Sequence, residues 1–169
     1  MTPQLFINTY LPFARLTEKK TGISAIAILA QAALESSWGE KAVGNALFGI
    51  KDTDGLNGNE QLIITTEILS TPNAHFPKII SITPFKVGVK IMYKYKVEDW
   101  FRKYNSPEDS LTDHAKFIQE NPRYAKALTV KHDPYKFVNE LAIAKYATAL
   151  NYAEVMKDMV YSIIKRLPN

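Results

Sequence analysis

The longest apolar stretch of the chain lies between residues 23 and 34, where only Ser24 and Gln31 interrupt the run of aliphatic side chains. This stretch predicts a helix over residues 23–37 that is apolar nearly all round, as is typical of a helix buried inside a domain. Gln31 and Glu35 are four positions apart, so they share one stripe of the helix. We therefore expect these two polar side chains to face one cavity.

Further helices are predicted on both sides of the chain's middle third. Residues 2–19 form one helix, which Thr21-Gly22 ends. Three later segments begin with a capping residue followed by proline, the pattern that starts a helix: Ser106-Pro107, Asn121-Pro122 and Asp133-Pro134. The last helix is predicted over about residues 151–166, with a core stripe of Tyr152, Val155, Met159, Val160, Ile163 and Leu167.

The middle of the chain shows the two-residue period of β-strands instead. Residues 62–69 and 86–98 alternate between apolar and polar positions, which predicts two antiparallel strands with one face half-buried. On the first strand, Glu67 lies on the same face as Ile63 and Leu69. Pro72, Pro77 and Pro84 predict that residues 70–85 form a long loop or flap at the tip of this hairpin.

These elements predict a single domain over residues 1–169 with a mainly α (α+β) fold. A β-hairpin lobe at about residues 52–100 interrupts the helices, and a cleft is expected between the helical parts. The length is sufficient for a real core, and a composition of 46% hydrophobic and 22% charged residues is that of a globular protein.

The composition disfavours metal and cofactor chemistry. The chain has no cysteine, which excludes disulfides and cysteine-based metal sites. The three histidines, at positions 75, 114 and 132, are scattered without ligand spacing. The polar loop over residues 52–60 lacks the glycine and glutamate spacing of an EF-hand, so we interpret its oxygen-bearing side chains as a solvated turn: Asp52, Asp54, Asn57 and Asn59. We expect neither a metal ion nor a cofactor.

The charge pattern also narrows the classes of partner. A net charge of +4 is mild, and no cluster of basic and aromatic residues indicates nucleic-acid binding. No apolar run is long enough to span a membrane. Residues 1–10 have neither the basic segment nor the apolar stretch of a signal peptide. We expect a monomer, and export by some other route if it acts outside the cytoplasm.

Two glutamates suggest a chemistry. Glu35 ends the buried helix, where the apolar surroundings and the last backbone carbonyls both disfavour its ionised form. Glu67 lies on an otherwise apolar strand face. A protonated and an ionised carboxyl group across a cleft are the apparatus of glycoside hydrolysis. Each glutamate alone also fits a structural role, as a solvated helix end or as a cross-strand ion pair.

Several ordered motifs point to one family. They are Ala-Gln-Ala-Ala-Leu-Glu-Ser-Ser-Trp-Gly at residues 30–39, Asn-Ala-Leu-Phe-Gly-Ile-Lys at 45–51, Thr-Thr-Glu at 65–67, Phe-Arg-Lys-Tyr-Asn-Ser at 101–106, Asn-Pro-Arg-Tyr-Ala-Lys-Ala-Leu at 121–128 and Lys-Tyr-Ala-Thr at 145–148 with Asn-Tyr-Ala at 151–153. From about residue 15 to the C-terminus, the chain closely resembles the bacterial glucosaminidase family (glycoside hydrolase family 73), which includes flagellar and autolysin-type peptidoglycan hydrolases.

The resemblance implies a lysozyme-like fold that cleaves the β-1,4 bond after N-acetylglucosamine in bacterial peptidoglycan. It implies Glu35 as general acid, Glu67 as the second carboxylate on the hairpin and Tyr146 as an aromatic residue beside the cleft. Tyr146 also fits a packed core tyrosine. Substrate contacts are expected from five further side chains: Gln31, Trp38, Phe48, Tyr124 and Tyr152. The expected setting is the cell wall, reached by release like that of a phage lysin or by a specialised export apparatus.

Two departures from the family pattern keep alternatives open. The family's glycine, aspartate and proline in the last block are replaced, so that Ala149 and Leu150 follow Thr148. The segment between Glu67 and Phe101 is also longer than expected, and Glu98 is the alternative second carboxylate if the register differs. The alternatives are a non-catalytic glycan-binding or assembly module, and a muramidase or lytic transglycosylase that cuts the other glycosidic bond. Inversion, retention and participation of the substrate's acetamido group all remain possible mechanisms.

Overall fold

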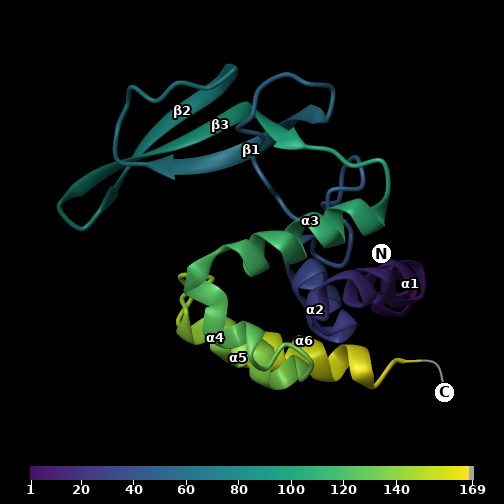
Figure 1. Ribbon diagram of the computed structural model, residues 1–169. Coiled ribbons are helices and arrows are strands. Elements are labelled where there is room, and N and C mark those ends of the chain that lie inside the picture. Colours follow the sequence, from purple (N-terminus) through teal and green to yellow (C-terminus); the bar gives the residue numbers. More distant parts are fainter. Residues whose placement is uncertain (168–169) are drawn as a thin grey trace. The chain divides into compact units, whose positions relative to one another are not determined.

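The computed structural model describes residues 1–167, which divide into two compact units (Figure 1). The helical unit comprises Met1–Phe48 and the residues from Tyr104 onward, and the sheet unit comprises Gly49–Lys103. The predicted class, mainly helical with a small antiparallel sheet, is confirmed. That residues 1–169 act as one domain stays a prediction.

The helices of the helical unit are α1 (Pro3–Thr21), α2 (Ala25–Glu35), α3 (Pro107–Glu120), α4 (Ala125–Leu128), α5 (Pro134–Ile143) and α6 (Tyr152–Ile164). A single 3-10 turn, η1 (Pro122–Tyr124), precedes α4. The predicted caps are present, since the side chains of Ser106, Asn121 and Asp133 each accept a hydrogen bond from a backbone N–H of the first turn. In α6 the buried residues are Tyr152, Met156, Val160 and Ile163, so Met156 takes the core position that was expected for Val155 or Met159.

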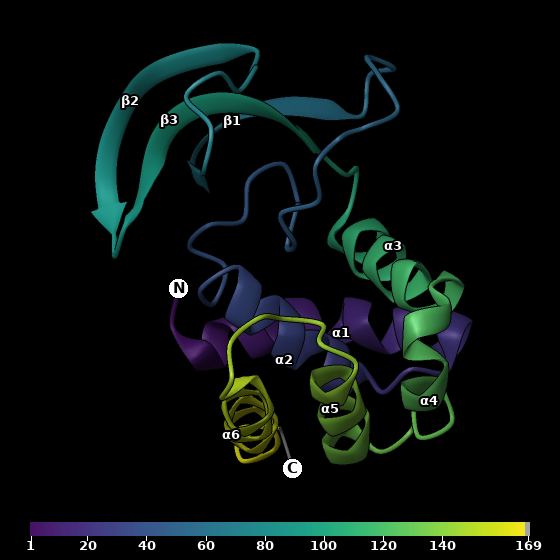
Figure 2. The same ribbon diagram turned by 90° about the vertical axis from the view of Figure 1, so that its left-hand side faces the viewer.

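Helix α2 is the centre of this unit. It contacts α1, α3, α5 and α6, and Figure 2 shows α5 and α6 side by side. Eight of its eleven residues are buried, which confirms the expectation of a helix that is apolar nearly all round. It begins two residues later than predicted, with Ser24 as the residue before it. It ends two residues earlier than predicted, because Ser37 and Trp38 adopt left-handed backbone angles (φ 52° and 57°) that lie outside the right-handed helical region.

The sheet unit contains β1 (Glu60–Leu69), β2 (Lys78–Val87) and β3 (Lys90–Arg102). All pairings are antiparallel, and the spatial order β1-β3-β2 makes β3 the central strand. β2 and β3 form a strongly curved hairpin (Figure 2). Glu67 lies opposite Tyr95, and β1 alternates between half-buried and exposed residues from Gln61 onward, as its sequence predicts.

The prediction of a long loop over residues 70–85 was wrong for its second half, which from Lys78 onward is strand β2. Pro84 is tolerated there because β2 is an edge strand, whose outward N–H groups have no partner strand. The predicted strand over residues 86–98 was wrong at its start, where Gly88 (φ 60°) makes the turn between β2 and β3. The hairpin expected between residues 62–69 and 86–98 is therefore a three-stranded sheet.

Candidate active site

Glu35 is the last residue of α2, and Ser36 organises the turn that follows it. The Ser36 hydroxyl donates to the carbonyl of Ala32 (2.6 Å) and accepts from the Gly39 N–H (2.9 Å). Water reaches the Glu35 side chain, which counts as exposed. Enough protein nevertheless surrounds the carboxyl group that desolvation raises its pKa. The direction agrees with the sequence-based expectation for a proton donor.

A group of aromatic rings, the aromatic cluster, brings together side chains from α3, η1, α6 and two loops: Phe48, His114, Tyr124, Tyr146 and Tyr152. Phe48 stacks on His114 with ring centroids 3.7 Å apart, and Tyr146 stacks on Tyr152 at 5.6 Å. Tyr146 also meets His114 at 5.9 Å and Tyr124 at 6.0 Å, so it is the ring that joins the others.

The Glu35 carboxylate acts electrostatically on two tyrosines of the aromatic cluster. Burial, followed by the nearby Glu35 carboxylate, raises the pKa of the Tyr146 hydroxyl well above its usual value. For Tyr152, burial and Glu35 raise the pKa of the hydroxyl, while its hydrogen bond with Gln31 acts in the opposite direction. Both phenols are therefore neutral at physiological pH and available as hydrogen-bond donors.

Gln31 connects the cluster to α2. Its Nε2 donates to the Tyr152 hydroxyl (3.2 Å), and its Oε1 lies 3.3 Å from Nε2 of His114. Because an amide oxygen only accepts, this second bond requires that His114 carry its proton on Nε2. Burial lowers the pKa of His114 to about 3, so the imidazole is neutral. Gln31 is itself buried, and each polar atom of its amide makes one of these two bonds.

His114 is a site residue that the sequence analysis did not single out. It lies on the buried side of α3 with Leu111, Ala115 and Ile118, at the spacing of an apolar helix stripe. A histidine on such a stripe is a signal of a buried polar contact, and it could have been found from the sequence on that ground.

The remaining predicted contact residues of the helical unit occupy different surroundings. Phe48 and Tyr124 are buried within the aromatic cluster. Trp38 is half-buried in the turn after α2, where its ring meets Phe6 edge-on with centroids 5.6 Å apart. The substrate contacts predicted for these side chains, and for Gln31 and Tyr152, stay predictions.

In the sheet unit, Glu67 is held in an ion-pair triad with Lys51 and Asp99. The Lys51 ammonium lies 2.8 Å from Oε1 of Glu67 and 2.9 Å from Oδ2 of Asp99. The alternative carboxylate, Glu98, pairs instead with Lys78 (3.1 Å). Because neighbouring residues of a strand point to opposite faces, Glu98 is on the other side of β3 from Asp99.

Neither a metal site nor a membrane-spanning helix is found among residues 1–167. No three His, Asp or Glu side chains in this range lie together in a way that could hold a metal ion. Likewise, no helix of this range is long and apolar enough to cross a bilayer.

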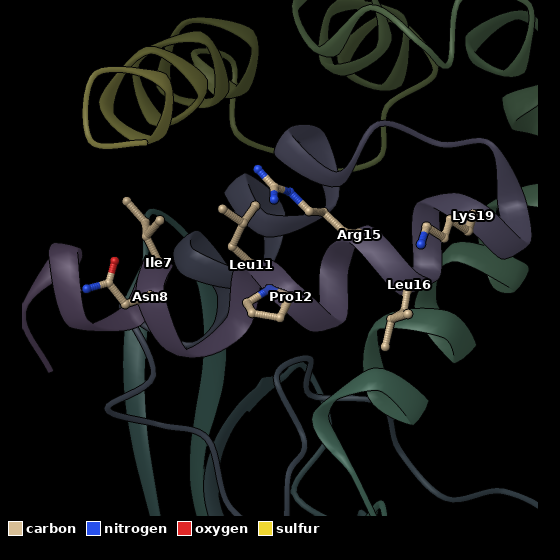
Figure 3. Close-up of a pocket in the computed structure, with 7 residues that line it drawn as sticks. All are labelled: Ile7, Asn8, Leu11, Pro12, Arg15, Leu16 and Lys19. Carbon is tan, nitrogen blue, oxygen red and sulfur yellow. The ribbon is translucent and has the colours of Figure 1, made fainter. Parts of the chain in front are cut away.

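A groove of about 450 Å³ runs along α1 (Figure 3). Its lining includes Leu11, Pro12 and Leu16 together with the cationic Arg15 and Lys19. No carboxylate and none of the predicted site residues line it, so this groove does not provide the two carboxyl groups that glycoside hydrolysis needs.

Comparison with known proteins places these observations in a family. The family profile described as glucosaminidase, mannosyl-glycoprotein endo-beta-N-acetylglucosaminidase, matches residues 11–165. The peptidoglycan hydrolase FlgJ of Vibrio parahaemolyticus is 33% identical over 159 residues, which are 90% of this chain and 45% of that protein. FlgJ of Pseudomonas aeruginosa is also 33% identical, over 88% of this chain and 34% of that protein. The chain thus spans less than half the length of these curated relatives.

Solved structures agree with the sequence comparison. A C-terminally truncated glycoside hydrolase domain of Salmonella typhimurium FlgJ superposes with a TM-score of 0.70 at 29% identity, covering 96% of this chain and 97% of that one. The catalytic domain of the autolysin Auto from Listeria monocytogenes gives a TM-score of 0.66 at 27% identity, covering 99% and 90%. The family resemblance predicted from the sequence motifs is confirmed, and this chain belongs to the glucosaminidase family of glycoside hydrolases.

Proposed function

We propose that this protein is an endo-β-N-acetylglucosaminidase that hydrolyses the β-1,4 bond after N-acetylglucosamine in bacterial peptidoglycan, with Glu35 as general acid. Peptidoglycan is supported by the relatives, which are peptidoglycan hydrolases. The observation that carries the assignment of Glu35 is its position at the end of α2, where desolvation raises its pKa while the side chain stays accessible to water.

The reaction needs Glu35 to arrive protonated and to leave ionised. Its proton is transferred to the glycosidic oxygen as the bond from that oxygen to the anomeric carbon breaks, and water supplies the new hydroxyl group at that carbon. A raised pKa favours the protonated form near neutral pH. We assign Tyr146 to the same site, because its neutral hydroxyl belongs to the aromatic cluster that is electrostatically coupled to Glu35.

Glu67 has the complementary role in this proposal. Its carboxylate lies 2.8 Å from the Lys51 ammonium, and this contact holds it in place as a group that stabilises positive charge on the sugar or accepts a proton from the attacking water. In this division of roles Glu35 gives the proton and Glu67 acts as the second carboxylate.

Gln31 supports the site through the aromatic cluster. It is bonded to His114 and Tyr152, and we propose that it fixes the orientation of the Tyr152 ring against Tyr146. Trp38, in the turn after α2, and Tyr124, a member of the cluster, are also proposed to contact glycan. We place the action of the protein at the cell wall, where its substrate is found.

The test is an analysis of borohydride-reduced fragments after digestion of purified peptidoglycan by wild type, Glu35→Gln and Glu40→Gln. Glu40 is the matched control, because it is an exposed glutamate five residues beyond Glu35. We expect new reducing N-acetylglucosamine ends from wild type and Glu40→Gln, and none from Glu35→Gln. Reducing N-acetylmuramic acid would instead identify a muramidase, and anhydro-muramic ends a lytic transglycosylase. Wall binding without any fragments would identify a non-catalytic module.

A further inference from the structure

Lys51 is the last residue of the Asn-Ala-Leu-Phe-Gly-Ile-Lys motif at residues 45–51. Its backbone pairs with Phe101 of β3 as an isolated antiparallel bridge, flanked by hydrogen bonds from Arg102 N–H to the Ile50 carbonyl and from Asp52 N–H to the Trp100 carbonyl. This pairing fixes the Lys51 backbone beside the central strand. Its ammonium group reaches two carboxylates that belong to different strands, Glu67 on β1 and Asp99 on β3.

The two carboxylates of this triad are more buried than the ammonium group that joins them. The side chains of Glu67 and Asp99 are 28% and 17% exposed, and that of Lys51 is 45% exposed. The rings of Phe76 and Phe101 lie 5.9 and 6.0 Å from the Lys51 nitrogen. Partial burial alone would lower the pKa of Lys51, but its bonds with Glu67 and Asp99 outweigh burial and raise it. Lys51 therefore carries its positive charge at physiological pH.

Other groups that could act on Glu67 are occupied elsewhere or lie on the other face. Tyr95, opposite Glu67, donates its hydroxyl proton to the Thr71 carbonyl (2.9 Å). Lys94 and Lys96 flank Tyr95 in β3 and so point away from the face of Glu67. Lys78 is paired with Glu98. Within residues 1–167, Lys51 is the cation that pairs with Glu67.

We propose that Lys51 is a positioning residue that orients the Glu67 carboxylate, and that Asp99 opposes it by competing for the same ammonium group. This inference rests on the proposed role of Glu67 in the reaction. It assigns functions to two residues, and it makes them act in opposite directions. Loss of Lys51 leaves two neighbouring carboxylates without their shared cation, whereas loss of the Asp99 charge leaves Lys51 to Glu67 alone.

The experiment is the pH profile of kcat/KM on purified peptidoglycan, measured with Lys51→Met, Lys51→Arg, Asp99→Asn and Glu67→Gln. We expect Lys51→Met to lower kcat/KM by about tenfold or more across the profile, through kcat rather than KM, because the Glu67 carboxylate loses the cation that orients it. Lys51→Arg keeps a cation and restores most of the activity. Asp99→Asn leaves Lys51 to Glu67 and keeps at least the wild-type kcat/KM. A purely structural role of the triad would not be rescued by another cation, and it would not be spared when the second carboxylate of the triad is neutralised.

The matched control is Lys78→Met, which removes a lysine–carboxylate pair of the same sheet without touching Glu67. We expect it to keep the wild-type profile, and thermal unfolding monitored by circular dichroism shows that each variant is folded. If Lys51→Met and wild type share one profile while Glu67→Gln is inactive, the positioning role is overturned and the proposed function stands. If Glu67→Gln is as active as wild type, the role of Glu67 fails, and the inference about Lys51 fails with it.

Discussion

Glu35 and His114 show how desolvation acts on single residues of one site. Both groups are pushed toward their neutral forms, which raises the pKa of the carboxyl group and lowers that of the imidazole. The consequences differ because Glu35 remains in contact with water and His114 is buried. One neutral group can give its proton to a substrate, and the other keeps its proton in a fixed hydrogen bond with Gln31.

Replacing Glu35 should affect stability in a pH-dependent way. Its folded-state pKa is raised, so the folded state holds this proton more tightly than the unfolded chain, and the contribution to stability is lost as the pH rises through the folded-state pKa. We expect Glu35→Gln to unfold at the same or a higher temperature than wild type at pH 7. The difference should shrink at pH 4. A clear destabilisation by Glu35→Gln at pH 7 would contradict a desolvated carboxyl group.

His114 predicts the opposite dependence. Its pKa is about 3 in the folded protein and 6.5 in the unfolded chain, so the unfolded state gains a proton first as the pH falls. Between pH 6.5 and pH 4 this difference removes up to about 3 kcal/mol of unfolding free energy. We expect urea unfolding of His114→Gln to show a weaker pH dependence than wild type over this range. Identical slopes for both proteins would show that His114 is not the group responsible.

At the scale of elements, the turn after α2 determines where Glu35 lies. Trp38 N–H donates to the Ala33 carbonyl (2.7 Å), and Gly39 adopts a left-handed conformation with φ 83°. A Cβ atom on Gly39 would lie 3.3 Å from the Phe6 ring. The end of α2, Trp38 and Gly39 thus form one packed unit together with Phe6. This packing explains why a tryptophan and a glycine follow so soon after Glu35 in the sequence.

Substitution of Gly39 tests this unit. Gly39→Ala combines an unfavourable backbone conformation with a close contact, so we expect it to lower the unfolding free energy by about 1–2 kcal/mol. Gly58→Ala is the control, because Gly58 has φ 98° and nothing lies within 4 Å of its would-be Cβ. Urea unfolding should show a larger loss of unfolding free energy for Gly39→Ala than for Gly58→Ala. Equal losses would mean that the Phe6 ring moves aside without a measurable loss of stability.

The sheet shows which elements the sequence could predict. The two-residue period of β1 predicted which side chains are half-buried, because that strand has one face covered. β2 has no such pattern, since nine of its ten residues are exposed and the register shifts between Ile79 and Ser81. Pro84 within the strand, together with Pro72 and Pro77 before it, then suggested a loop. Periodicity predicts burial, and a strand exposed on both faces has little burial to predict.

For the candidate site, the sequence could place two residues on one face of a helix but could not pair side chains with their partners. Glu35 and Gln31 could be placed on one helix stripe because the helical period is local. The bonds of Gln31 with His114 and Tyr152 join residues far apart in the chain, and so does the ion pair of Lys51 with Glu67. Such contacts depend on tertiary packing, which one sequence does not reveal by spacing alone.

At the scale of the whole molecule, the two compact units differ in how much of their surface is buried. In the helical unit α2 contacts four other helices, whereas β2 pairs along one edge and exposes nearly all of its side chains. We expect hydrogen–deuterium exchange to be slowest for amides of α2 and fastest, among paired strands, for amides of β2. Comparable protection of β2 and α2 would mean that β2 is covered in solution, for example by a second copy of the chain.

The alanines of α2 have a consequence for engineering the protein. Ala25, Ala27, Ala30, Ala32 and Ala33 are at most 3% exposed, so any larger side chain there must displace a neighbouring helix. Because the same helix ends at Glu35, that displacement would reach the site. Combinatorial libraries that aim at new activities should therefore leave these alanines constant and diversify β2, where sequence can change while the core stays intact.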